Sequence, residues 1–267
     1  MSDEDRELIN KIFEILRMAE QWAGQESPPV QPGSSLATDN ARTDPHQISH
    51  AVIYSIGIAV DHLHSMRMAL TGKGDGQIGL HTYAPFTLTR GALENASAAI
   101  WMLAPSNRQE RIRRRLWYEL ASIKQAEGLL NEAHLPQKEG IQRRRDRVLG
   151  LADAARIDRA RLKGKPTYQD YLEEAGRFTD LVDGENNLVY IMWKMCSAVA
   201  HGDTWILPFF DLEMVGPHEP GVGTYRVTAP TPLLHSAVKA AALLVDRAQH
   251  LLARRGTAHV GQDRAIS

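Results

Sequence analysis

Apolar residues recur at intervals of three and four along most of this chain, the spacing that gives an α-helix one buried face. The first such segment follows Ser2, a good helix N-cap, and ends near Gly24. Further helices are expected over residues 45–70, 82–103, 105–133 and 138–155, in a short segment from Pro166, and over residues 185–201 and 231–253. The pattern predicts an all-α helical bundle, with more than half of the chain in helix.

Two segments depart from the helical pattern. Residues 24–45 are rich in proline, serine and glycine and are expected to form a loop or linker. Residues 206–228 contain two strand-like runs on either side of a glycine and proline turn, which predicts a small β hairpin inserted before the last helix. Two strands cannot form a core alone, so the hairpin is expected to lie on the bundle. Residues 1–255 are thus expected to form one helical domain, followed by a frayed tail at 256–267.

The composition favours a soluble cytoplasmic protein. Hydrophobic residues make up 43% of 267 residues, enough for a sizeable core. The N-terminus is acidic, and no apolar run reaches the roughly 20 residues of a membrane helix, so no membrane association is expected. The single cysteine, Cys196, excludes an intrachain disulfide and a cysteine-rich zinc site.

Basic residues are concentrated in the middle of the chain. The segment from Arg108 to Lys165 has 16 Lys and Arg against 8 Asp and Glu, although the whole chain has a net charge of −1. Its arginines, with Arg114 and Arg144 as candidate binding residues, could contact the phosphates of RNA. The favoured interpretation is instead a solvated helix face on which these arginines pair with neighbouring acids such as Glu110.

Charged residues also stand out on the apolar helix predicted at 82–103. Arg90 and Glu94 are four residues apart and can pair on one helix face, either to fix helix register or to form the wall of a binding pocket. Asp61 and His64 on the preceding helix could join Glu94 in a metal or ligand site. A helical di-metal site needs two Glu-x-x-His elements, which the chain lacks, so no metal or cofactor is predicted.

Three candidate catalytic residues share one face of the helix predicted at 185–201. Lys194, Ser197 and His201 lie three to seven residues apart, so a cation, a hydroxyl and an imidazole form one stripe. Gly202 fits the end of this helix, where a cationic imidazole is favoured by the helix dipole. The alternative is that His201 caps its helix or bonds a neighbouring carboxylate.

The Arg90-x-x-x-Glu94 pair and the later Ser197-x-x-x-His201-Gly202 helix end resemble the HEPN-like helical proteins of bacteria. Several HEPN families are metal-independent endoribonucleases of toxin or phage-defence systems, with a motif of arginine, four to six residues and histidine. Six residues separate Lys194 from His201, as in that motif, although this chain has lysine in place of arginine and an apolar Met195 after it.

The resemblance implies RNA binding or cleavage by a homodimer with facing active sites, alongside an antitoxin-like protein partner. His201 would act as general acid or base on a ribose 2′-hydroxyl, Lys194 would stabilise the phosphorane, and Ser197 would orient the imidazole or bind a phosphate oxygen. The alternative function is a non-catalytic helical bundle that binds a protein partner or a small ligand, with Arg90 and Glu94 holding register or lining a pocket.

Overall fold

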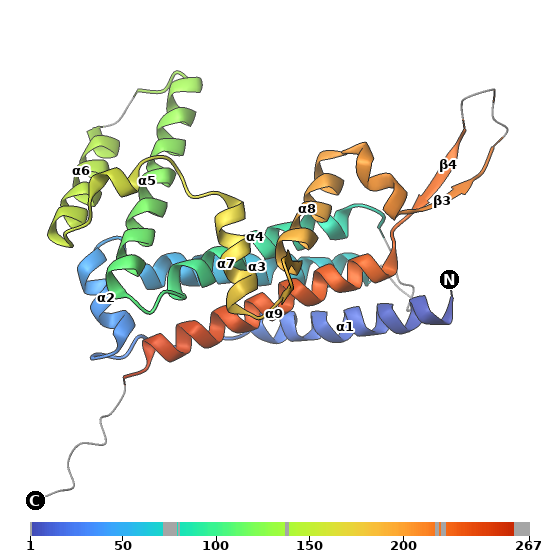
Figure 1. Cartoon of the computed structure of the whole chain (residues 1–267), viewed down its shortest axis with the longest axis horizontal. Helices are drawn as coiled ribbons and strands as arrows, with labels where there is room; N and C mark the ends of the chain where they lie inside the picture. Colours follow the sequence, from blue (N-terminus) through green and yellow to red (C-terminus); the bar gives the residue numbers. More distant parts are fainter. Residues whose placement is uncertain are drawn as a thin grey trace, which may run out of the picture.

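The structure is a computed structural model that describes residues 2–71, 79, 81–136, 139–216, 219 and 223–258. Helices account for 72% of the chain, which confirms the predicted all-α bundle (Figure 1). The α-helices are α1 (Asp3–Ala23), α2 (Ser35–Thr43), α3 (Ile48–Leu70), α4 (Ala84–Leu103), α5 (Arg108–Glu132), α6 (Glu139–Ala154), α7 (Tyr168–Phe178), α8 (Leu188–His201) and α9 (Thr231–Gly256). The 3-10 helices are η1 (Arg159–Leu162) and η2 (Thr204–Phe209), and the paired strands are β1 (Val182–Asp183) with β2 (Asn186–Asn187) and β3 (Asp211–Met214) with β4 (Tyr225–Thr228).

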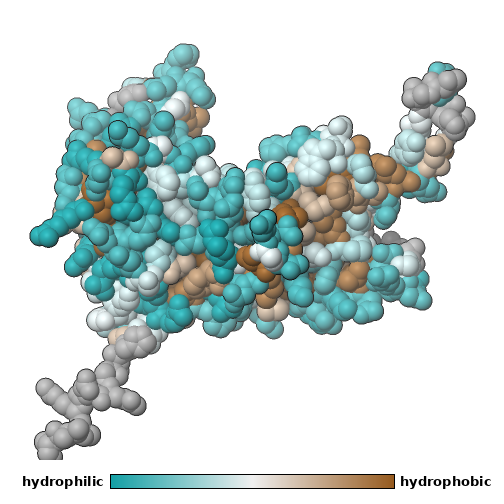
Figure 2. Space-filling model, viewed as in Figure 1, coloured by the Kyte–Doolittle hydropathy of each residue, from teal (hydrophilic) through white to brown (hydrophobic). Residues whose placement is uncertain are grey.

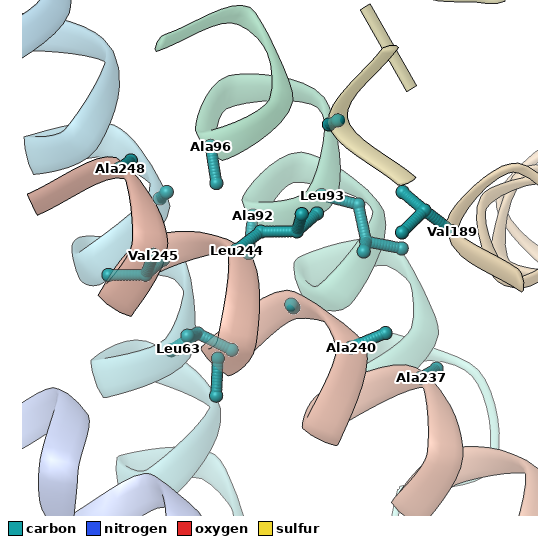
Figure 3. Packing of buried hydrophobic residues seen from close by; sticks show 14 of the residues in the cluster. Leu63, Ala92, Leu93, Ala96, Val189, Ala237, Ala240, Leu244, Val245 and Ala248 are labelled. Atoms are coloured by element: carbon teal, nitrogen blue, oxygen red, sulfur yellow. The ribbon is translucent and has the colours of Figure 1, made fainter. Parts of the chain in front are cut away.

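Helix α4 is the centre of the bundle. It packs against α3, α9, α7 and α8, so nearly every face of its apolar sequence is covered. Figure 3 shows Ala92 of α4 beside Leu244 of α9, where the small alanine side chain lets the two helices approach. This central position puts the polar residues of α4 at the junction of several helices.

The segment predicted as a loop at 24–45 contains an additional helix, α2. Ser34 caps it by accepting a hydrogen bond from the Ala37 amide at 3.1 Å. Leu36 and Asp39 are fully buried, and α2 packs on α3 and α5. The prediction of a continuous loop was therefore wrong, because a short helix with few apolar residues is held by its cap and by buried contacts.

The predicted hairpin forms only in part of its segment. Residues 204–209 are a 3-10 helix, whereas Asp211–Met214 pair with Tyr225–Thr228 in antiparallel register. These strands are almost wholly exposed and project from the bundle (Figure 1), so the expectation that the hairpin lies on it was wrong. Cross-strand hydrogen bonds, not burial of a face, support the strands. The predicted frayed tail falls mostly outside the described residues, and Gly256 belongs to α9.

A second, smaller core joins α5, α6 and η1, which extend from the bundle in Figure 1. Its buried residues are Ile112, Leu116, Ile123, Val148, Ala152, Ile157 and Leu162. In the part of the chain that the structure describes, no helix combines the length and hydropathy of a membrane span.

Candidate functional site

Arg90 connects helices α4 and α8. Its Nε donates to Oε1 of Glu94 at 2.7 Å, one turn along α4. Its Nη1 lies 2.9 Å from Nε2 of His201, the last residue of α8. The predicted Arg90–Glu94 pair is therefore present, and it extends to the candidate catalytic histidine 111 positions further along the chain.

Trp193 completes this arrangement. Its indole Nε1 donates to the same Glu94 Oε1 at 2.8 Å, so one carboxylate oxygen accepts hydrogen bonds from both helices. The side chains of Arg90 and Glu94 are 21% and 12% exposed, which leaves both reachable from solvent. Arg90, Glu94, Trp193 and His201 are hereafter the Arg90 cluster.

The contact with Arg90 constrains the tautomer of His201. A guanidinium has only donors, so a hydrogen bond here needs Nε2 of His201 as the acceptor, with a proton on Nδ1. The imidazole is exposed at the end of α8. Gly202 ends the helix at φ 73°, a left-handed conformation that glycine adopts without strain.

The structure separates the other predicted catalytic residues from this contact. Lys194 is exposed, and its Nζ lies 5.7 Å from the centre of the Tyr190 ring. Ser197 is half-buried one turn before His201, and its hydroxyl has no hydrogen-bond partner among the described residues. The cation that touches the imidazole is thus Arg90 of α4. Helical spacing could not reveal this contact, because it joins two distant helices.

Two clefts meet the Arg90 cluster. The first has a volume of about 530 Å³ and is lined by His201, by Thr87 of α4 and Leu207 of η2, and by Tyr83 and Phe210, which flank those two helices. The second, of about 570 Å³, is lined by Glu94, Trp193 and residues of α5, α7 and α8. His201 and Glu94 therefore face different clefts, and Arg90 connects them.

Arg114 is held inside the protein by several partners. It bonds Glu110 at 3.0 Å, Glu174 at 2.7 Å and the Trp101 carbonyl at 2.7 Å, and its side chain is 13% exposed. Burial alone would raise the pKa of Glu110, but hydrogen bonds from Arg113 and Arg114 lower it to about 2. Arg114 is therefore paired with acids, as the favoured interpretation expected, but it is largely buried and does not lie on a solvated helix face.

Arg144 has a similar environment on α6. Its Nε donates to Oε1 of the buried Glu119 at 2.6 Å, and Arg115 pairs with the other oxygen at 2.9 Å. His46 contacts the same carboxylate through Nδ1 at 3.2 Å. Arg144 remains 48% exposed, so part of its guanidinium can still meet a ligand.

A buried ion pair between α2 and α5 was missed in the sequence. Oδ2 of Asp39, which is fully buried, accepts from Nε of Arg111 at 2.6 Å, and Oδ1 accepts from Arg108 at 2.9 Å. Arg111 is itself buried and also donates to the carbonyls of Pro105 and Ser106. The signal that could have indicated it is the Ser34 cap, which predicts a helix carrying Asp39.

The possible metal or ligand site does not assemble. Asp61 and His64 line a separate cleft of about 520 Å³ beside Trp22 and His250, whereas Glu94 belongs to the Arg90 cluster. Among the described residues, no group of three His, Cys, Asp or Glu side chains could hold a metal ion. Burial raises the pKa of the Cys196 thiol to about 12, as expected for a core residue.

Comparison of the chain with protein-family models, with curated proteins and with solved structures finds no match. The function is therefore argued from the geometry of the site.

Proposed function

We propose that this protein is a HEPN-like RNA-binding protein that cleaves single-stranded RNA at the Arg90 cluster. The observation that carries the proposal is the 2.9 Å contact between Arg90 Nη1 and His201 Nε2 at the edge of a cleft. An imidazole can act as the general base on a ribose 2′-hydroxyl, and a guanidinium beside it can stabilise the charge of the phosphorane. In this proposal Arg90 takes the role of the cation that the HEPN resemblance assigned to Lys194.

The reaction follows from the donors and acceptors of the two side chains. An incoming phosphate accepts hydrogen bonds from Arg90, which frees Nε2 of His201. Nε2 then takes the proton of the 2′-hydroxyl while the 2′-oxygen bonds to phosphorus. The bond from phosphorus to O5′ breaks, O5′ takes a proton from solvent, and the products are a 2′,3′-cyclic phosphate and a 5′-hydroxyl. Arg90 stabilises the charge that develops on the phosphorane.

Other residues support the geometry. Glu94 holds Arg90 through Nε, which leaves the Nη atoms for the imidazole and a phosphate. Ser197 lies one turn before His201 and has a free hydroxyl among the described residues, which fits a contact to a phosphate oxygen or to the imidazole. Lys194 and the exposed part of Arg144 would contribute to binding the RNA backbone.

A homodimer is part of the proposal. The apolar faces of α4 and α9 are largely buried within the chain itself, so these helices do not offer the surface for a dimer. Exposed apolar side chains lie instead on η2 and the hairpin: Trp205, Phe209, Leu212 and Met214, hereafter the η2–hairpin surface. Figure 2 shows hydrophobic surface where the hairpin leaves the bundle. Because η2 follows His201 directly, pairing through this surface would bring two sites together.

A non-catalytic bundle is the alternative, and one observation favours it. The contacts of Arg90 with Glu94 and His201 also tie α8 to α4, which is a structural use for all three side chains. In that case His201 serves the fold and not a substrate.

Incubating purified protein with a mixed pool of single-stranded RNA tests the proposal. The wild type should produce fragments with 2′,3′-cyclic phosphate ends, with or without a chelator, and His201→Ala should produce none. The melting temperature should be nearly unchanged, because His201 is exposed. His50→Ala, at another exposed histidine, is the matched control and should cleave normally. An inactive wild type together with a destabilised His201→Ala variant would establish the non-catalytic alternative.

A further inference from the structure

Aromatic side chains from three helices line the cleft that contains Glu94. Tyr118 comes from α5, Tyr168 and Tyr171 from α7, and Tyr190 and Trp193 from α8. These helices meet around α4, and Pro166 and Lys165 close the cleft at the segment before α7. A volume of about 570 Å³ lies within the range of sites for small molecules.

The rings are not all core residues. Tyr171 is buried, but Tyr168 is 48% exposed and Trp193 is half-buried. Tyr190 stacks on Trp193 with ring centres 5.7 Å apart and planes inclined by 22°, and Tyr168 lies 6.2 Å from Trp193. Exposed ring faces beside a cleft offer a stacking surface for a planar group.

Glu94 supplies the polar end of the cleft. Its Oε1 already accepts hydrogen bonds from Arg90 and Trp193, which hold the carboxylate in place. Both of the hydrogen bonds that Glu94 accepts from described residues go to Oε1, so Oε2 is available to a ligand. A carboxylate can only accept, so a ligand here must present N–H donors.

We infer that this cleft binds the base of a guanine nucleotide, stacked on Tyr168 and Trp193 with its N1–H and N2–H donating to Glu94. Guanine has two adjacent donors on its Watson–Crick edge, and both can reach Oε2. In uracil the single N–H is flanked by two carbonyls, and in adenine and cytosine a ring acceptor adjoins the amino group. Those acceptors would face the carboxylate, so guanine is preferred. The exposed Lys165 at the rim is suited to the phosphate.

The inference rests on the proposed function and deepens it, because the base could come from RNA or from a free nucleotide. Arg90 joins Glu94 of this cleft to His201 of the other cleft, so a bound guanine would select the phosphodiester that is cleaved. The base and the reacting phosphate would occupy the two clefts on either side of Arg90.

Calorimetric titration with GMP, AMP, CMP and UMP tests the site in the full chain. GMP should bind at least about tenfold more tightly than the other three nucleotides. Tyr168→Ala should weaken GMP binding by about tenfold, since loss of one stacking ring costs that much. Tyr54→Ala, which removes a tyrosine that is 71% exposed on α3, is the matched control and should bind as the wild type does. Glu94→Gln should remove the preference for guanine, and Lys165→Ala should weaken GMP binding but not guanosine binding.

Equal affinity for all four nucleotides, no binding of any, or unchanged binding by Tyr168→Ala would overturn the inference. The His201→Ala variant, titrated with a uridine oligonucleotide containing one guanosine and with the same oligomer lacking it, separates RNA from free nucleotide as the source. RNA cleavage by the wild type without GMP binding would leave the ribonuclease function standing and remove the guanine site. GMP binding without RNA cleavage would leave the guanine site standing and remove the ribonuclease function.

Discussion

Trp193 Nε1 of α8 donates to Oε1 of Glu94 on α4 at 2.8 Å, the oxygen that also accepts from Arg90 Nε. One partly buried carboxylate thus holds an indole and a guanidinium at once. The indole faces the aromatic cleft, while the guanidinium reaches His201 beside the other cleft. This shared acceptor is what makes a single site out of residues from two helices.

Arg90→Ala should destabilise the fold by about 2 kcal/mol. The change leaves Glu94, which is 12% exposed, with Trp193 as its remaining donor. The double change Arg90→Met with Glu94→Leu should cost less, because it removes the charge that would otherwise lose its partner. Urea unfolding of the three proteins measures both effects. Negligible losses in both variants would show that the pair contributes nothing to the fold.

Asp39→Asn should be among the most damaging single changes, with a loss of about 3–5 kcal/mol. It removes the charge that neutralises the buried Arg111 and also contacts Arg108. Glu213→Gln is the matched control, because its partner Arg226 and Glu213 itself are each 65% exposed. An exposed pair is worth little, so this variant should change stability by less than about 1 kcal/mol. Similar unfolding free energies for the two variants would contradict the prediction.

The Arg90–Glu94 and Asp39–Arg111 pairs also show how much of the fold can be predicted from the sequence. The helices were found because their apolar faces repeat along the chain, as in α4, whose burial follows from its composition. Helix α2 was missed because it is only nine residues long and has no repeating apolar face. Its buried side chains include the polar Asp39 and Thr43. Its stability comes from the Ser34 cap and from Arg111 on α5, a partner 72 positions away.

The candidate site was predictable only within each helix. The spacing of four placed Arg90 with Glu94, and the structure shows their hydrogen bond. Spacing also grouped Lys194 with His201, two turns apart on α8. It could not show which helix faces α8, so the contact between Arg90 and His201 and the bond from Trp193 required the tertiary structure.

His46 should make the fold less stable as the pH falls below 6.5. Burial lowers the pKa of His46 below its ordinary value of 6.5; Glu119 opposes the shift, while Arg115 and Arg144 add to it. Its Nε2 is buried without a hydrogen-bond partner among the described residues. Near pH 6 the unfolded chain therefore binds a proton at His46 that the folded protein does not bind. The free energy of unfolding decreases as the pH is lowered through this range. Well above pH 6.5 His46 is neutral in both states, and this loss of stability is absent.

Urea unfolding between pH 5 and 7.5 measures this effect. His46→Gln should show a smaller loss of stability on acidification than the wild type, because the variant has no proton to bind at this position. His50→Gln, at an exposed histidine on α3, is the control and should keep the pH dependence of the wild type. An unchanged slope in His46→Gln would assign the acid sensitivity to other groups.

The protein should form a homodimer through the η2–hairpin surface. Trp205 and Phe209 are 50% and 54% exposed, and Leu212 and Met214 extend the same apolar region onto β3. Light scattering over a hundredfold concentration range should give twice the chain mass of 29.7 kDa for the wild type. The double variant Trp205→Ser with Phe209→Ser should be monomeric with an unchanged helical spectrum, because both rings are already half exposed. Tyr54→Ser, at an exposed tyrosine on α3, should remain dimeric. A wild type that stays monomeric at every concentration would exclude the dimer and with it the pairing of two His201 sites.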